Sequence, residues 1–159
     1  MIDINTIDHT IFMKEALKEA LKAGKRGDRP IGAVIVHNGQ IISRGSSRSK
    51  TRKSDVAHAE NTAILKCQSF LKDNGRECIL YTTVEPCVMC LSTAVLANIR
   101  SIVFGLEDKY MNMKAFIQSN PYIRSRIHNY ILGILESESI AVLQQYAPED
   151  VRVMLTGIR

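Results

Sequence analysis

Two short motifs in this chain contain side chains that could bind a metal ion. His58 and Glu60 are separated by one residue, and Cys87 and Cys90 form a C-x-x-C pair that follows a proline. One imidazole and two thiolates are three ligands for zinc. A catalytic zinc site keeps its fourth position open, whereas a structural site is usually closed by four protein ligands. The motifs therefore predict a catalytic zinc centre.

Both motifs are expected to lie at the starts of helices. Proline is tolerated at a first helical position, and the residues after Pro86 are mostly apolar, so a helix is predicted to begin at this proline and Cys87. A second helix is predicted from Ala57 to about Leu71. Residues three apart on a helix are neighbours and a helix N-terminus favours a thiolate, so Cys87 and Cys90 can reach one ion.

Glu60 is predicted to carry protons beside the metal rather than to bind it. A zinc ion with two thiolate ligands is formally neutral and polarises water less than an all-histidine site, so a carboxylate that takes and returns a proton complements it. Two alternatives remain open. Cys67 or Cys78 could close the site as a fourth ligand, although neither has ligand spacing, or the cysteines of the second motif could form a redox pair.

The combination of H-x-E and P-C-x-x-C is the signature of zinc nucleobase deaminases. The chain resembles the cytidine and deoxycytidylate deaminase superfamily, in particular the branch of tRNA adenosine deaminases, guanine deaminases and small nucleoside deaminases. The resemblance runs from about Met13 to Tyr146, which is most of the chain. The stretches that carry it are Pro30–Val36, His58–Glu60, Leu80–Cys87, Met89–Cys90, Val103–Gly105 and Gly133–Leu135.

This resemblance implies an α/β fold, a three-layer α-β-α sandwich with a five-stranded mixed sheet between helices. The 159 residues are expected to form one domain, 1–159, with a core of about 7–146. The tail, 147–159, has no predicted role. Its alternation of Val151, Val153 and Leu155 fits either an edge strand or a contact with a partner.

Hydrophobic patterning predicts the individual elements. Asn38-Gly39 is a type I′ turn signal and predicts a hairpin. The alternation of strand and helix after residue 78 predicts a parallel pair with a right-handed crossover, and the metal motifs then lie at the carboxyl ends of strands. The predicted strands are 31–37, 40–44, 78–83, 101–105 and 126–132. Three further helices are predicted. The first begins at Thr6 or Asp8 and ends at Gly24 or Gly27, a short one includes Met111 to Ile117, and the last spans 137–146 and is stopped by Pro148.

The resemblance also implies an activity, a cofactor and site residues. The reaction is hydrolytic deamination of an aminated nucleobase to its keto form with release of ammonia, and Zn²⁺ is the cofactor. His58, Cys87 and Cys90 are the implied ligands, and Glu60 is the implied catalytic acid and base. Substrate contacts are expected from Arg29, Ser47, Ala59, Pro86 and Asp108.

Two of these positions depart from the tRNA adenosine deaminases. Ser47 replaces an asparagine that contacts the nucleoside, and Arg29 replaces a small apolar residue before Pro30. A site without a required hydrogen bond discriminates poorly for its old ligand, and a guanidinium suits a carbonyl, carboxylate or phosphate. We therefore expect a free base, nucleoside or nucleotide as substrate. The alternative is adenosine at the wobble position of tRNA, which the basic loop 43–55 favours, and a non-catalytic zinc module is a remote alternative.

Composition adds only broad limits. Apolar residues make up 45% and charged residues 23% of the chain, which is ordinary for a globular protein. The formal charge is +5 and permits contact with phosphates. The sequence has no apolar stretch that would span a membrane and no secretion signal at Met1 to Asn5, so we expect a cytoplasmic protein. The resemblance implies a homodimer.

Overall fold

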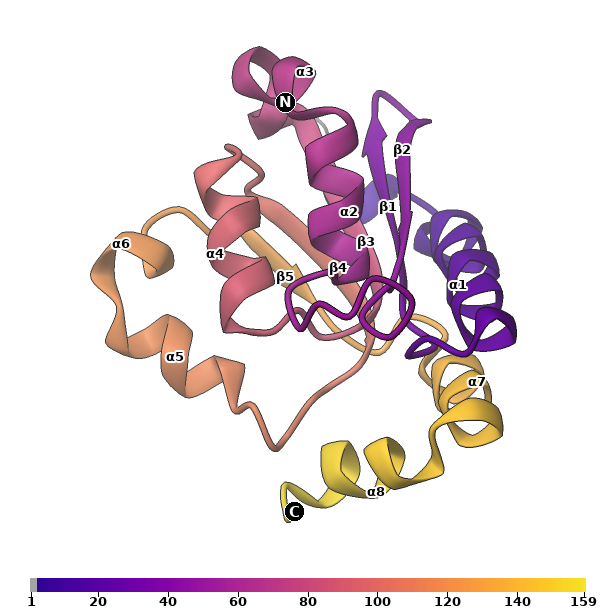
Figure 1. The fold of residues 1–159 in the computed structure, drawn as a ribbon. Coiled ribbons are helices and arrows are strands. Elements are labelled where there is room, and N and C mark those ends of the chain that lie inside the picture. Colours follow the sequence, from indigo (N-terminus) through magenta and orange to yellow (C-terminus); the bar gives the residue numbers. More distant parts are fainter. Residues whose placement is uncertain (1–2) are drawn as a thin grey trace.

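The computed structural model describes residues 3–159 and has a five-stranded mixed sheet at its centre (Figure 1). Met1 and Ile2, which belong to the stretch predicted to lack a secretion signal, lie outside the described residues. The strand order is β2-β1-β3-β4-β5, with β1 antiparallel to both neighbours and β3, β4 and β5 mutually parallel. The predicted mixed sheet is confirmed. Its strands are β1 (Gly32–His37), β2 (Gln40–Ser46), β3 (Cys78–Val84), β4 (Ser101–Leu106) and β5 (Asn129–Ile131).

Helices cover both faces of the sheet and complete the predicted three layers. One face packs against α1 (His9–Arg26) and α7 (Glu136–Tyr146), and the other packs against α2 (Ala59–Lys66) and α4 (Val88–Leu96). The remaining helices are α3 (Gln68–Asn74), α5 (Met113–Ser119), α6 (Pro121–Arg124) and α8 (Pro148–Thr156), with 3₁₀ turns at Ile4–Thr6 and Gly75–Glu77.

The central strands divide their apolar side chains between two cores. Successive residues of a strand point to opposite faces. In β1, Ala33 and Ile35 therefore pack towards α2 and α4, while Val34 and Val36 pack towards α1. β3 is buried along its whole length. This double burial explains why the strands read as continuous apolar runs rather than as alternating patterns.

The first helix and the hairpin form where the sequence predicts them. α1 begins after Asp8, whose carboxylate accepts a hydrogen bond from the backbone N–H of Thr10, and it ends at Gly27 with a positive φ of 90°. Asn38 and Gly39 also have positive φ values, 48° and 74°, as a type I′ turn requires.

Cys67 divides the predicted helix from Ala57 to Leu71 into α2 and α3. Its backbone has φ −125° and ψ 22°, outside the helical region, and its N–H bonds three residues back to Ile64. The chain then restarts as α3 with a hydrogen bond from Leu71 to the Cys67 carbonyl. The prediction of one unbroken helix with Cys67 at its middle is therefore wrong.

The fifth strand is shorter than predicted, because the start of the range 126–132 continues a helical turn. The N–H groups of Arg126 and Ile127 both bond to the Ile123 carbonyl at the end of α6. Pairing with the sheet begins only at Asn129, next to Ser101 of β4. Tertiary hydrogen bonding has overridden the strand propensity here.

The tail forms a helix, α8, so the alternative of an edge strand is wrong. Pro148 ends α7 and also occupies the first turn of α8, where its missing N–H costs nothing. Val151 and Met154 of α8 pack against Val84 and Leu106 at the ends of β3 and β4. Over residues 3–159, no helix combines the length and apolar character needed to cross a bilayer.

Candidate metal centre and active site

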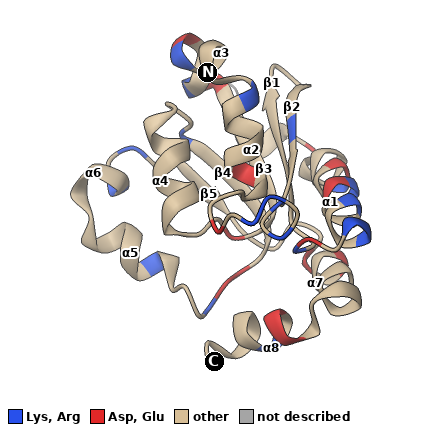
Figure 2. Cartoon of the chain, viewed as in Figure 1, with Lys and Arg blue, Asp and Glu red and all other residues tan. Residues whose placement is uncertain are grey.

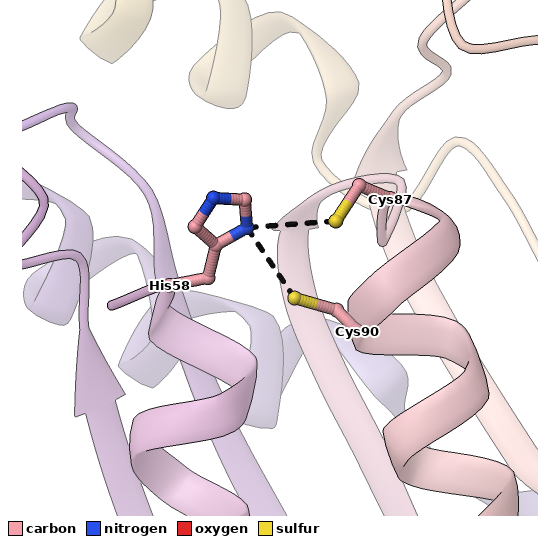
Figure 3. Close-up of side chains that lie close together, drawn as sticks. All are labelled: His58, Cys87 and Cys90. Carbon is pink, nitrogen blue, oxygen red and sulfur yellow. Dashed lines mark hydrogen bonds between the residues drawn. The ribbon is translucent and has the colours of Figure 1, made fainter. Parts of the chain in front are cut away.

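His58, Cys87 and Cys90 converge at the starts of two neighbouring helices (Figure 3). His58 is the residue before α2, Cys87 is the residue before α4, and Cys90 lies in the first turn of α4. The Nδ1 atom of His58 is 3.5 Å from Sγ of Cys87 and 3.4 Å from Sγ of Cys90. The three ligand atoms all lie within 4.8 Å of one another.

These separations fit one zinc ion. Zinc bonds to sulfur at about 2.3 Å and to imidazole nitrogen at about 2.0 Å, so a tetrahedral arrangement places the nitrogen about 3.5 Å from each sulfur. The observed distances of 3.4 and 3.5 Å are close to that value. The remaining cysteines do not belong to the group: Cys67 bonds to the Ala63 carbonyl and Cys78 to the Asn74 carbonyl. The three ligands therefore suit Zn²⁺ with one position left open.

Close packing of α2 on β2 determines where His58 lies. Gly45 of β2 faces the Ala59 carbonyl, and a Cβ atom at Gly45 would overlap that oxygen and the Ala63 amide. The absence of a side chain therefore lets the first turn of α2 lie directly against the strand. Because β2 and β3 both pair with β1, the same sheet also fixes the start of α4.

The two thiols next to His58 have unequal proton affinities. Hydrogen bonding to Cys90 is the main cause that lowers the pKa of Cys87 to about 4, and the His58 side chain lowers it further. The same bond is the main cause that raises the pKa of Cys90, and burial adds to it. Cys87 therefore supplies a thiolate readily, and metal binding must release the proton held on Cys90.

Glu60 lies in the first turn of α2 and is almost fully buried, with 3% of its surface exposed. Its Oε1 accepts a hydrogen bond of 3.2 Å from the Thr82 hydroxyl of β3. Burial is the main cause that raises the pKa of Glu60. The raised pKa makes this carboxyl group a better proton acceptor than an exposed glutamate, which suits a general acid and base.

A small cavity of about 70 Å³ adjoins these side chains. Glu60, His58 and Cys87 line it together with Arg29 and Asp108, both predicted to contact substrate. Its other walls are mostly apolar and come from the residue before β1, the end of β3 and the residue after it, the loop before α5, and α8: Ile31, Val84, Glu85, Met111 and Met154. A larger hollow of about 470 Å³ lies at the other end of β3. The smaller cavity is the candidate active site, because the ligands and the buried acid face it.

Arg29 connects the cavity to the C-terminal helix. Its guanidinium Nε lies 3.1 Å from Oδ2 of Asp150 in α8, and both side chains are partly exposed. Lys109, in the loop after β4, donates a backbone hydrogen bond of 3.0 Å to the Met154 carbonyl of the same helix. These two contacts hold α8 over the mouth of the cavity, where Met154 forms part of the wall.

Ser47, Ala59 and Pro86 lie close to the site but do not line the cavity. Ser47 is buried; its carbonyl accepts a 2.6 Å hydrogen bond from Arg26, and its hydroxyl is 3.4 Å from that of Ser49. Ala59 and Pro86 are buried beside the ligands in sequence. In this structure, the Ser47 side chain points to its own loop.

Glu85 contributes to the site through contacts that the sequence indicates only by proximity. Its buried carboxylate accepts hydrogen bonds from the Tyr130 hydroxyl at 2.8 Å and from the Asp108 backbone N–H at 3.0 Å. Burial raises the pKa of Glu85, and the two hydrogen bonds oppose that rise. Glu85 therefore fixes the loop that places Asp108 at the cavity. The tail residues Asp150 and Met154 have no sequence signal of this kind, because their role depends on the position of α8.

A family model confirms the resemblance seen in the sequence. The model described as the cytidine and deoxycytidylate deaminase zinc-binding region matches residues 6–106. The matched range includes the three ligands and Glu60, but it ends before Asp108 and before α8.

Named relatives and solved structures agree with the family model. The chain is 42% identical over 99 residues to a tRNA-specific adenosine deaminase of Bacillus subtilis, an alignment that spans 62% of this chain and 62% of that relative. It is 33% identical over 148 residues to a tRNA-specific adenosine deaminase of Agrobacterium fabrum, covering 89% of this chain and 95% of that one.

Among solved structures, one from a study of A-to-I editing by tRNA:A34 deaminases has a TM-score of 0.73 and 35% identity, covering 84% of this chain and 99% of that chain. A guanine deaminase from Bacillus subtilis has a TM-score of 0.59 and 36% identity, covering 69% and 70% of the two chains. The same fold thus serves proteins named for different substrates, so fold alone does not identify the substrate of this chain.

The purified protein should contain about one zinc ion per chain, because the three ligands form one site. Cys87→Ala should lose most of the metal, since it removes the ligand that ionises most readily. Elemental analysis after growth in zinc-replete medium measures both, with Cys67→Ala as the control that keeps its zinc. Full occupancy in Cys87→Ala, or no zinc in the parent protein, would contradict the ligand assignment.

Proposed function

We propose that this chain, which belongs to the cytidine and deoxycytidylate deaminase zinc-binding family, is a hydrolytic deaminase of an aminated nucleobase. The main support is that the buried carboxyl group of Glu60 and a three-ligand zinc site face one cavity. A site closed by four protein ligands would leave no position for water and no use for Glu60. The relatives named as deaminases support the same reaction.

In this mechanism Glu60 moves the protons. Zinc, when bound, lowers the pKa of a water molecule and so provides a nucleophile near neutral pH. Glu60 accepts the proton from that water and donates it to the ring nitrogen next to the carbon under attack. Glu60 then takes the proton of the hydroxyl group now on that carbon and delivers it to the amino group. The carbon–nitrogen bond breaks, ammonia leaves, and the base remains in its keto form.

Glu60→Gln should keep its fold and zinc but lose most of its turnover. General acid and base groups typically contribute a factor of about 10² to 10⁴ in rate. The glutamine keeps the size of the side chain but cannot carry a proton. Ammonia release and metal content should be measured together, with the exposed Glu77→Gln as the control. If Glu60→Gln releases ammonia at a rate within a few fold of the parent protein, Glu60 has a structural role.

We propose a free base, nucleoside or nucleotide as the substrate. The cavity is small, about 70 Å³, and α8 lies over its mouth through the Arg29–Asp150 ion pair. Arg29 is half exposed at this mouth and presents a planar set of donors to a carbonyl or phosphate. Ser47 directs its hydroxyl to Ser49, which leaves the nucleoside without the amide contact expected in the tRNA editors.

Adenosine in tRNA is the second candidate, because the relatives named above carry that activity in their names. A basic loop between β2 and α2, residues 48–53, adds support (Figure 2). Asp28 anchors this loop by accepting hydrogen bonds of 2.9 Å from the Lys50 and Thr51 amides. Arg52 and Lys53 remain exposed and could follow an RNA backbone.

A substrate panel separates the two candidates. We expect ammonia from at least one member of a set of bases, nucleosides and nucleotides, with a rate that changes little between low and high salt when the substrate is neutral. Deamination of tRNA should instead fall steeply as salt rises, because phosphate contacts release counterions. Inosine formed in tRNA, with every small compound left intact, would reject the small-molecule substrate and leave the deaminase reaction standing.

We also propose that the chain forms a homodimer through the outer face of α2 and α4. The two helices pack beside one another, and α2 exposes Leu65 (62%) while α4 exposes Leu96 (69%), apolar side chains that a partner would cover. Light scattering at micromolar concentration should give twice the chain mass. The Leu96→Glu variant should be a monomer. The Leu132→Glu variant, which changes an exposed residue after β5, should remain a dimer. A monomeric parent protein would reject the dimer.

A cytoplasmic location fits the thiol chemistry. All four cysteines are free, and two of them serve the zinc site as thiolates. A reducing compartment keeps such thiols available, whereas an oxidising one favours disulfides.

A further inference from the structure

A second hollow lies at the end of the sheet opposite the zinc site. Its volume is about 320 Å³, and it opens beside the 470 Å³ hollow, with which it shares two lining residues. β3 has seven residues, so its two ends are separated by about 20 Å at ~3.3 Å per residue. We call it the arginine hollow; it is lined by Arg76, Arg100, Ser125, Arg126 and His128.

Three positive charges meet in the arginine hollow without a carboxylate among its lining residues. Within residues 3–159, none of the three arginines forms an ion pair. Figure 2 shows basic residues on the chain that leaves α6 and on the link between α4 and β4. Proteins rarely bring like charges together without a partner, because each raises the free energy of the others.

Arg100 is the unusual member of this group, because only 6% of it is exposed. Its guanidinium donates hydrogen bonds to the carbonyls of Val95 (2.9 Å) and Ile99 (3.3 Å) and to the Asn98 side chain (3.2 Å). These neutral acceptors orient the charge but do not neutralise it. Burial lowers the pKa of Arg100, and the charges of Arg76 and Arg126 lower it further. Buried charges normally have a counter-charge, and within residues 3–159 no carboxylate forms an ion pair with Arg100.

The chain also holds the arginine hollow in a fixed shape. The Arg126 guanidinium stacks 3.6 Å from the centre of the Tyr122 ring and donates to the Ser125 hydroxyl at 3.3 Å. The N–H groups of His128 and Asn129 both bond to the Arg100 carbonyl, which joins the segment after α6 to the start of β4. Two arginines from separate elements are thereby oriented before any ligand arrives, and such preorganisation lowers the cost of binding.

We propose that the arginine hollow binds a phosphate group. Guanidinium groups bind phosphate through paired hydrogen bonds, and three of them with a hydroxyl and an imidazole match its charge and its several acceptor oxygens. Because the zinc site is about 20 Å away along β3, the phosphate cannot belong to the nucleotide whose base is being deaminated. It comes either from a separate phosphorylated small molecule or from a distant backbone phosphate of a nucleic acid.

Binding of inorganic pyrophosphate and of a short single-stranded RNA, measured by calorimetry on the zinc-loaded protein at low salt, tests this proposal. The double variant Arg76→Gln, Arg126→Gln should weaken binding at least about tenfold, while the deamination of a small substrate stays unchanged. Arg124→Gln on α6 is the matched control outside the hollow and should bind both probes as the parent does. Arg52→Gln in the basic loop should bind pyrophosphate as the parent does. Arg100 is left intact, because its buried guanidinium also supports the fold.

The two sources of phosphate give different patterns. Saturable binding of one pyrophosphate per chain identifies a small phosphorylated ligand. Binding of RNA alone, with a strong dependence on salt that decreases in the double variant, identifies a backbone phosphate. If neither probe binds, or if the double variant binds both probes as the parent does, the proposal is wrong. If Arg52→Gln instead loses pyrophosphate binding, the phosphate lies at the basic loop and the proposal for the arginine hollow is equally wrong.

Discussion

The site depends on two helices that begin within reach of a single metal ion. His58 precedes α2 and Cys87 precedes α4, and both helices pack on the same face of one sheet. Their relative position is set by backbone contacts, since Gly45 leaves the first turn of α2 directly against β2. A bulkier residue would push that turn outwards, and a shift of 1 Å is large compared with the tolerance of a zinc–ligand bond. The metal centre is therefore a property of how the layers pack.

A second set of buried contacts joins the end of β3, next to the metal ligands, to β5 at the edge of the sheet. Glu85 directly follows β3, accepts a hydrogen bond from Tyr130 of β5 and orients the loop that carries Asp108. Tyr130 also packs against Phe104 of β4, with ring centres 4.8 Å apart. Parallel strands have their carboxyl ends on one edge, so short polar links of this kind can connect three strands there. The loop over the cavity is thus supported by the strands beneath it.

Sequence patterns correctly predict the structural features that are determined by residues close together in the chain. The metal motifs, the Asn38-Gly39 turn and the Asp8 cap each carry their own stereochemical reason, and each is found where the sequence indicates. The break at Cys67 and the helical turn at Arg126 cannot be predicted this way, because both residues are compatible with the element expected and tertiary hydrogen bonds decide otherwise. The same holds for the tail, where alternation suggests a strand but Pro148 and packing on Val84 favour a helix.

The walls of the cavity come partly from the range that the family model matches and partly from residues outside that range. The range matched by the family model, 6–106, contains the metal ligands and Glu60. Asp108, Met111 and Met154 line the same cavity from outside that range. The segment that carries the metal ligands and Glu60 therefore forms only part of the cavity wall, and the segment after Leu106 completes it. Exchange of the segment after Leu106 between family members would change part of the cavity wall while keeping the metal ligands and Glu60. One set of reacting groups could in this way act on different substrates.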